Sequence, residues 1–323
     1  MCGRCARSSI ESGHGRHGEG SIADHAPYGA PEPSLTRIVL ATCRAKPALT
    51  SSDALLATEL ERAGATVVAT PWDAVTSAHD NPGTVCLRST WDYHRRWTEF
   101  QAWVGGFAKG NGRLWNPAET VLWNADKLYL RDLGEAGIGL PRTRWFEPGE
   151  RPDAEVILRQ WKLSRAVLKP RISATAFGTY LVSAGRAQSD EEWKPLETSG
   201  GLLQAFVPEV ESRGEISLVY VDGEFSHAVR KRPAGGDFRV QRDFGGSVEA
   251  VTPSRSIHAF GDAVLAAVSR PWLYARVDLV ETDRGPVLME LELIEPDLFL
   301  TSAAAARLAA ALLARAGKAA ARR

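Results

Sequence analysis

The chain has 323 residues, of which 44% are hydrophobic, enough for two or three modest α/β units around a cleft. Lys and Arg together number 39, as do Asp and Glu, so the formal charge is zero and we expect no binding to nucleic acid or to an acidic membrane. Because the four cysteines are too scattered for a disulfide framework and no apolar run reaches the roughly 20 residues that span a bilayer, we expect a cytoplasmic protein.

The first 34 residues are polar and rich in glycine, and we expect them to be a disordered tail or an over-long start. They contain Cys2, Cys5, His14 and His17, whose spacing resembles that of a zinc site. The segment lacks the strand and helix pattern of a zinc finger, so we expect a tail rather than a metal site.

Residues 35–120 show the pattern of a small parallel, doubly wound α/β domain. Strands are expected at 37–42, 65–70 and 84–88. Between the first two strands, a helix is expected to begin at residues 51–53 and to end at Gly64.

The residues after the third strand are candidates for substrate binding, because α/β sheets bind ligands at the carboxyl ends of their strands. These candidates are Arg88, Ser89, Thr90 and Asp92. The alternative is that Arg88 forms an interdomain salt bridge beside a packed Trp91.

Two α+β lobes are expected to follow, at residues 121–200 and 201–323. The first begins with a helix at 125–136, with Asn124 as its N-cap and Gly137 at its end. It continues with a strand at 142–146, a helix at 153–163 and a strand that ends at Lys169. The second lobe is expected to contain two hairpins, at 216–229 and 273–294, with helices at 257–269 and from 303 onward.

In the first hairpin, we expect the Asp222-Gly223 turn to place Arg230 opposite Glu215, and we expect His227 to be a structural side chain. In the second hairpin, a turn centred on Arg284 would place Asp278 opposite Glu290 and Arg276 opposite Glu292. The residues between them are expected to face a core: Val277, Leu279, Met289, Leu291 and Leu293.

Three carboxylates on one sheet face need a compensating cation, and their hard oxygen atoms suit Mg²⁺. Asp278, Glu290 and Glu292 are therefore candidate metal ligands. The alternative is a solvated sheet face on which Arg276 pairs with Glu292.

Two further segments suit a nucleotide. Lys169 ends an apolar strand and precedes a loop of small residues at 171–180, which can lie over phosphates although it lacks the Walker pattern. The apolar segment 202–207 can hold adenine, and Glu209 or Glu211 can reach the ribose hydroxyls.

The order of these motifs resembles the ATP-grasp superfamily, in which two lobes clamp ATP between their sheets. The motifs are Lys127 on a helix, Lys169 before its loop, Gln204-Ala-Phe-Val207, Gly214-Glu215, Arg276-Val-Asp278 and Met289-Glu-Leu-Glu292. Residues 236–246 resemble the glutathione synthetase pattern, with Gln241 and Glu292 where that family has Asn. Residues 88–93, 114–117, 123–133, 227–231 and 290–296 resemble the ATP-grasp ligase of cycloserine biosynthesis.

The resemblance implies a ligase that activates a small carboxylic acid, an amino-acid derivative, as an acyl phosphate for attack by an amine-type nucleophile, which can lie in the same molecule. It implies ATP and Mg²⁺, expected as two ions, with Mn²⁺ as the alternative metal. It assigns Arg276, Lys231 and Arg239 to the transferring phosphoryl group and the oxyanion that follows. It assigns to the nucleotide Lys127, Lys169, Ser173, Thr175, Gly178, Gln204, Phe206, Val207, Glu209 and Glu211.

Two other functions stay open at this point: an ATP-grasp phosphotransferase that releases a phosphorylated product, and a nucleotide-binding protein without turnover. The identities of the acid and the nucleophile are not fixed by these motifs. The oligomeric state is also open, with a homodimer as one option.

Overall fold

The structure is a computed structural model, and it describes residues 36–75, 83–109, 113–234 and 245–320. Residues 35–323 form one compact unit. The tail with its zinc-like spacing lies outside the described residues, as do Arg239 and Gln241. In the described part of the chain, no helix is both long and apolar enough to cross a membrane.

The first sheet is fully parallel, as the sequence predicts, with the strand order β2-β1-β3-β4. Its strands are β1 (Arg37–Thr42), β2 (Thr66–Pro71), β3 (Thr84–Leu87) and β4 (Arg113–Trp115). Alternate residues of β1 face opposite sides, and each side is covered by a helix. Ile38 packs with Leu56 of α1 (Ser51–Arg62), whereas Val39 belongs to the core that contains Phe100 of α2 (Trp97–Lys109).

The second sheet is a four-stranded layer with the order β5-β8-β6-β7. Its strands are β5 (Thr143–Phe146), β6 (Arg165–Pro170), β7 (Tyr180–Ser183) and β8 (Gly201–Ala205), and α5 (Ala154–Trp161) and α6 (Asp190–Trp193) contribute to its core. Because β8 pairs with β5 and β6, it belongs to this sheet, and the lobe boundary expected at residue 200 falls short of the sheet's last strand.

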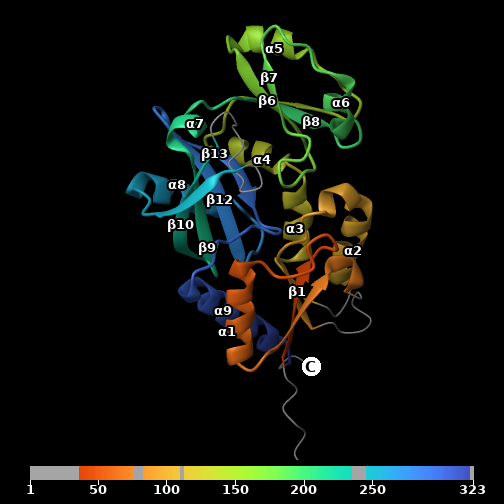
Figure 1. The fold of residues 1–323 in the computed structure, drawn as a ribbon, viewed down its shortest axis with the longest axis vertical. Helices are drawn as coiled ribbons and strands as arrows, with labels where there is room; N and C mark the ends of the chain where they lie inside the picture. The colour runs from red at the N-terminus through yellow and green to blue at the C-terminus, as the bar shows by residue number, and fades with distance from the viewer. Residues whose placement is uncertain (1–35, 76–82, 110–112, 235–244, 321–323) are drawn as a thin grey trace, which may run out of the picture. The chain divides into compact units, whose positions relative to one another are not determined.

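The third sheet is antiparallel, with the order β11-β10-β9-β12-β13. Its strands are β9 (Glu215–Val221), β10 (Glu224–Arg232), β11 (Ser247–Val251), β12 (Tyr274–Thr282) and β13 (Gly285–Glu292). One face packs on α4 (Tyr129–Glu135) and α8 (Arg255–Ala266). The C-terminal helix α9 (Ser302–Ala320) lies beside α1 (Figure 1), so the end of the chain completes the core of the first sheet.

The predicted start of the helix at 125–136 is wrong. The chain forms α3 (Ala118–Ala125) and then α4, and Asn124 lies inside α3 rather than at an N-cap. Its amide instead donates to the Leu291 carbonyl at 2.8 Å and accepts from the Leu293 N–H at 2.7 Å. Asn124 therefore fastens α3 to β13, a long-range role that local sequence does not reveal.

Candidate active site

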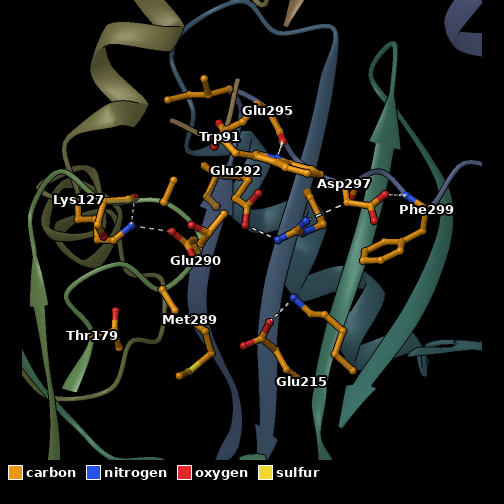
Figure 2. Close-up of a pocket in the computed structure, with 18 of the residues that line it drawn as sticks. Trp91, Lys127, Thr179, Glu215, Met289, Glu290, Glu292, Glu295, Asp297 and Phe299 are labelled. Carbon is orange, nitrogen blue, oxygen red and sulfur yellow. Dashed lines mark hydrogen bonds and ion pairs between the residues drawn. The ribbon is translucent and has the colours of Figure 1, made fainter. Parts of the chain in front are cut away.

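A cavity of about 930 Å³ is lined by strands of the second and third sheets and by segments that flank the first sheet. The loop after β6, the end of β8, and the strands β9, β10, β12 and β13 supply one part of its wall. The start of α1 and the segment after β3 supply another part. Figure 2 shows Glu290 and Glu292 between Lys127 on one side and Asp297 and Phe299 on the other.

The carboxylate pairing predicted for the second hairpin is confirmed. Asp278 pairs with Glu290, and Arg276 pairs with Glu292. One oxygen atom of each of Asp278, Glu290 and Glu292 lies within 4.8 Å of the others, which is close enough for shared coordination. Three hard oxygen donors at this spacing fit Mg²⁺, and a cation there would relieve the repulsion among the carboxylates.

The three carboxylates have different electrostatic surroundings. Burial and the charges of Glu290 and Asp278 raise the pKa of Glu292 to about 7, although its ion pair with Arg276 opposes the shift. Burial disfavours the Asp278 anion, but Arg276 and Lys231 hold the pKa of Asp278 well below its usual range. Asp278 is thus a fixed anion behind the cavity wall, whereas Glu290 and Glu292 face the cavity.

Two lysines predicted to bind phosphates line the cavity. Lys127 Nζ lies 2.7 Å from Glu290 Oε1 and 3.4 Å from the Ser173 carbonyl oxygen. Lys169 Nζ lies 3.0 Å from Gln204 Oε1. Burial, together with the charge of Lys127, lowers the pKa of Lys169. Both ammonium groups are therefore held where phosphate oxygens could replace part of their present contacts.

A third lysine, Lys231, also lines the cavity, and it pairs with a residue that was predicted to face Arg230. Lys231 Nζ lies 2.5 Å from Glu215 Oε1 and 3.0 Å from Asp278 Oδ2. The prediction that Arg230 stands opposite Glu215 is wrong, because β10 contains a bulge between Phe225 and His227. The bulge shifts the register by one residue and places Lys231 opposite Glu215. His227 is a structural side chain whose Nε2 lies 2.9 Å from the Leu298 carbonyl oxygen.

A second bulge changes the apolar end of the cavity. Between Asp278 and Leu279, β13 carries one extra residue, so that Leu279 pairs with Leu288. Met289 therefore lines the cavity instead of the core, in contrast to the prediction. It packs with Phe206 against a small cluster of Val207, Val210 and Val280. This apolar surface suits the flat face of a nucleotide base.

The segment after β8 is only partly in the cavity. Gln204, Phe206 and Val207 line it, as expected for a nucleotide site. Glu209 and Glu211 do not line it. Glu211 instead pairs with Arg165 at 2.9 Å, and Glu215 is the acidic residue in the cavity wall on this side.

The small-residue loop after β6 also lies at the cavity. Ser173 and Thr175 line it, whereas Gly178 does not. Gly178 has φ +65°, and a Cβ there would lie 2.7 Å from Pro170 Cγ and 2.9 Å from Pro195 Cβ, so its role is steric. Beside it, Phe177 stacks on His94 at a ring distance of 4.9 Å.

The residues predicted to bind substrate do not line the cavity. Arg88 is buried and pairs with Asp53 at 2.7 Å, and Ser89 and Thr90 are buried as well. Asp92 accepts a hydrogen bond from Trp72 Nε1 at 2.8 Å. The alternative for Arg88 is correct in part: the salt bridge forms, but within the N-terminal domain, and the contact to the C-terminal lobe is a hydrogen bond to the Pro296 carbonyl oxygen at 2.9 Å. The neighbouring side chains, Trp91 and Tyr93, point to the cavity instead.

Comparison with known proteins identifies the family of the chain. The RimK-like ATP-grasp domain matches residues 125–303, and the N-terminal domain of D-cycloserine synthetase DcsG matches residues 38–116. The chain belongs to the RimK-like ATP-grasp family. The predicted ATP-grasp fold is thereby confirmed.

Two relatives and one solved structure illustrate the likeness of this RimK-like protein. The cycloserine biosynthesis protein DcsG of Streptomyces lavendulae is 30% identical over 254 residues, covering 74% of this chain and 84% of the relative. A protein of Xylella fastidiosa named "Probable alpha-L-glutamate ligase" is 30% identical over 188 residues, covering 54% of this chain and 58% of the relative. The crystal structure of D-cycloserine synthetase DcsG has a TM-score of 0.73 at 27% identity, covering 87% of this chain and 99% of that one.

Several cavity residues of the RimK-like chain were not among the predicted site residues. They are Lys46, Ser51, Ser52, Trp91, Tyr93, Glu215, Met289, Glu295 and Asp297. Trp91 and Tyr93 could have been found from the strand end that precedes them. Glu295 and Asp297 lie a few residues after the candidate metal ligands Glu290 and Glu292 in the sequence. That they line the cavity follows only from the folded structure.

Proposed function

We propose that this RimK-like ATP-grasp ligase uses Mg²⁺-ATP to phosphorylate a small carboxylic acid and then transfers the acyl group to an amine-type nitrogen. The observation that carries the proposal is the cluster of Asp278, Glu290 and Glu292 beside Lys127, in a cavity of about 930 Å³. A cavity of this size has room for a nucleotide and a small second substrate.

In the first step, a carboxylate oxygen of the acid attacks the terminal phosphorus of ATP, and the bond to the departing ADP oxygen breaks. Lys127 and Lys169 would hold phosphate oxygens, while Arg276 and Lys231 would keep the metal-binding carboxylates charged and in place. Mg²⁺ would neutralise the charge that develops on the phosphates. Because Mg²⁺ keeps several waters and takes one or two carboxylates, three carboxylates suit two ions.

In the second step, the nitrogen nucleophile attacks the carbonyl carbon of the acyl phosphate, and inorganic phosphate leaves as the C–N bond forms. The proton that the nitrogen loses is taken up by the departing phosphate. The loop that contains Ser173 and Thr175 would cover the phosphate groups and limit the entry of water, which would otherwise hydrolyse the acyl phosphate.

The proposal also includes a division into three parts, one for each sheet. The N-terminal part, to about residue 120, would present the acid, and the lobes on either side of residue 205 would hold the nucleotide. This division places the end of β8 at the hinge between the two lobes.

The test is a screen of amino acids, ureido compounds and dipeptides for acid-dependent turnover with Mg²⁺ and ATP. ADP and inorganic phosphate in equal amounts, together with an amide product, are expected. ADP with a stable phosphorylated acid would identify a phosphotransferase instead. Nucleotide binding without turnover by any acid would contradict the proposed chemistry.

A further inference from the structure

The segment immediately after β13 is fixed by hydrogen bonds from distant parts of the chain. The Glu295 carbonyl oxygen accepts from Trp91 Nε1 at 3.3 Å, and the Pro296 carbonyl oxygen accepts from Arg88 Nη2 at 2.9 Å. The Ile294 carbonyl oxygen accepts from the Tyr274 hydroxyl at 2.9 Å. Three consecutive carbonyl groups are thus anchored, which defines the position from which the Glu295 side chain departs.

The Glu295 side chain has no such anchor. It lines the cavity, and the residue is only 8% exposed. Among the described residues, its carboxylate has neither an ion pair nor a hydrogen bond to another residue. The other carboxylates of the cavity wall are all engaged: Glu215 with Lys231, Glu290 with Lys127, Glu292 with Arg276, and Asp297 with the Phe299 N–H. The residue's own backbone N–H donates to this carboxylate, and burial, together with the charges of Glu292 and Glu290, raises the pKa of the Glu295 carboxyl well above its usual range. A buried carboxylate with which no other described residue forms an ion pair or hydrogen bond is costly, unless a ligand supplies the partner.

Two aromatic side chains of the cavity wall complete the surroundings of this carboxylate. Figure 2 shows Trp91 beside Glu295, toward the end of the view opposite Met289 and Thr179. Tyr93 lines the same cavity, and burial together with the charge of Glu295 raises the pKa of its phenol. The Trp91 ring already attracts a cation, because Lys46 Nζ lies 4.8 Å from its centroid. Aromatic faces combined with a carboxylate form a site for an organic ammonium group.

We propose that Glu295, with Trp91 and Tyr93, binds a positively charged amino group of the acid substrate and so selects amino acids over acids that lack this group. The inference rests on the proposed ligase function, whose metal-binding carboxylates end at Glu292, three residues before Glu295. An amino acid could then place its reacting carboxylate at the metal end and its ammonium group at Glu295. The bound amino group stays protonated and is not the nucleophile.

The experiment measures acyl phosphate formation without knowledge of the natural nucleophile. Purified full-length enzyme is given Mg²⁺, ATP, hydroxylamine and one acid from a panel that contains L- and D-amino acids and their matching deaminated acids. Hydroxylamine converts an acyl phosphate into a hydroxamate, which is measured together with phosphate release. We expect one or more amino acids to give a hydroxamate. For the matching acids without the amino group, kcat/KM should be at least about 100-fold lower, because the charged contact with Glu295 is lost.

Two variants then test whether the Glu295 carboxylate is responsible for this preference. Glu295→Gln should lower kcat/KM for the active amino acid by about 100-fold, chiefly through KM, and should reduce the preference over the deaminated acid. The Tm of Glu295→Gln should equal or exceed that of the wild type, because the glutamine oxygen can still accept from the residue's own backbone N–H and no other described residue loses a partner. Glu224→Gln, an exposed glutamate of β10 that pairs with Arg307, is the matched control and should leave kinetics unchanged.

Each contrary result has a distinct meaning. Equal kcat/KM for amino and deaminated acids, or wild-type kinetics in Glu295→Gln, would overturn the role of Glu295 while the ligase function stands. A clearly lower Tm for Glu295→Gln would identify a structural partner and would also overturn it. No hydroxamate from the wild type with any acid would overturn the ligase function and this inference together.

Discussion

Glu292 stands where the glutathione synthetase pattern has Asn, and it shares Arg276 with Asp278. Glu290 pairs with Lys127 instead, so the two glutamates are expected to respond differently to substitution. Glu290→Gln removes an anionic oxygen where charge develops in phosphoryl transfer, and turnover should fall at least about 100-fold. The affinity for ATP should fall much less.

Glu292→Asn provides the comparison, because a neutral oxygen can still bind Mg²⁺. We expect a smaller loss of turnover, partly restored by additional Mg²⁺. The measurement is steady-state phosphate release across a Mg²⁺ titration for both variants and the wild type. A wild-type rate of phosphate release in Glu290→Gln would contradict the proposal that this carboxylate binds the metal.

The buried side chain of His94 leads to a prediction about the pH dependence of stability. Burial, together with the charges of Arg95 and Lys127, lowers its pKa from 6.5 to about 4. Between these values the unfolded chain binds a proton that the folded protein does not, so stability is lost as the pH falls. The loss should reach about 2 kcal/mol at about pH 5.

His94→Phe keeps a ring against Phe177 and removes the titrating group. The Tm of this variant relative to wild type should therefore rise when the pH is lowered from about 7 to about 5. Differential scanning calorimetry at constant ionic strength measures this difference. A Tm difference that is independent of pH would show that His94 titrates normally.

At the scale of elements, Asn124 joins α3 to β13, the strand that carries Glu290 and Glu292. Its side-chain amide forms hydrogen bonds with the Leu291 carbonyl and the Leu293 N–H, on either side of Glu292. Asn124→Ala leaves a buried carbonyl and a buried N–H without partners, which should cost about 2–4 kcal/mol. Urea unfolding measures the cost, and turnover should fall as well because β13 loses its support.

Thr58→Ala serves as the control for Asn124→Ala. Thr58 donates to the Ala54 carbonyl on the exposed side of α1, and its loss should change stability by no more than about 0.5 kcal/mol. Equal stability of the two variants would contradict the assigned role of Asn124.

The same scale explains which parts of the site the sequence could predict. The pairing of Arg276 with Glu292 follows from strand alternation and a short turn, both of which are local. The pairing of Arg230 with Glu215 and the orientation of Met289 were predicted wrongly because β10 and β13 each contain a bulge. The extra residue in β10 shifts the register by one residue, and Met289 is itself the extra residue in β13. The positions of Arg88 and Glu295 are set by hydrogen bonds between segments about 200 residues apart in the sequence, and a local sequence pattern does not reveal such contacts.

At the scale of the whole chain, the cavity is lined by strands of the second and third sheets and by the segments that flank the first sheet, so a ligand that fills it should stabilise the folded unit. Mg²⁺-ATP at about 100 times its Kd should add about 2.7 kcal/mol by mass action. For a domain of this size, that corresponds to a rise in Tm of roughly 5 °C. A thermal shift titration with Mg²⁺-ATP measures the effect.

Two comparisons make this last prediction specific. ATP with a chelator in place of Mg²⁺ should give a smaller shift, because the carboxylate cluster would then repel the phosphates. Lys169→Met should also reduce the shift, since it removes a partly buried ammonium group from the cavity wall while keeping most of the side-chain volume. An unchanged Tm at millimolar Mg²⁺-ATP would contradict the cavity as the nucleotide site. An equal shift with and without Mg²⁺ would leave the nucleotide in the cavity but remove the metal from the carboxylates.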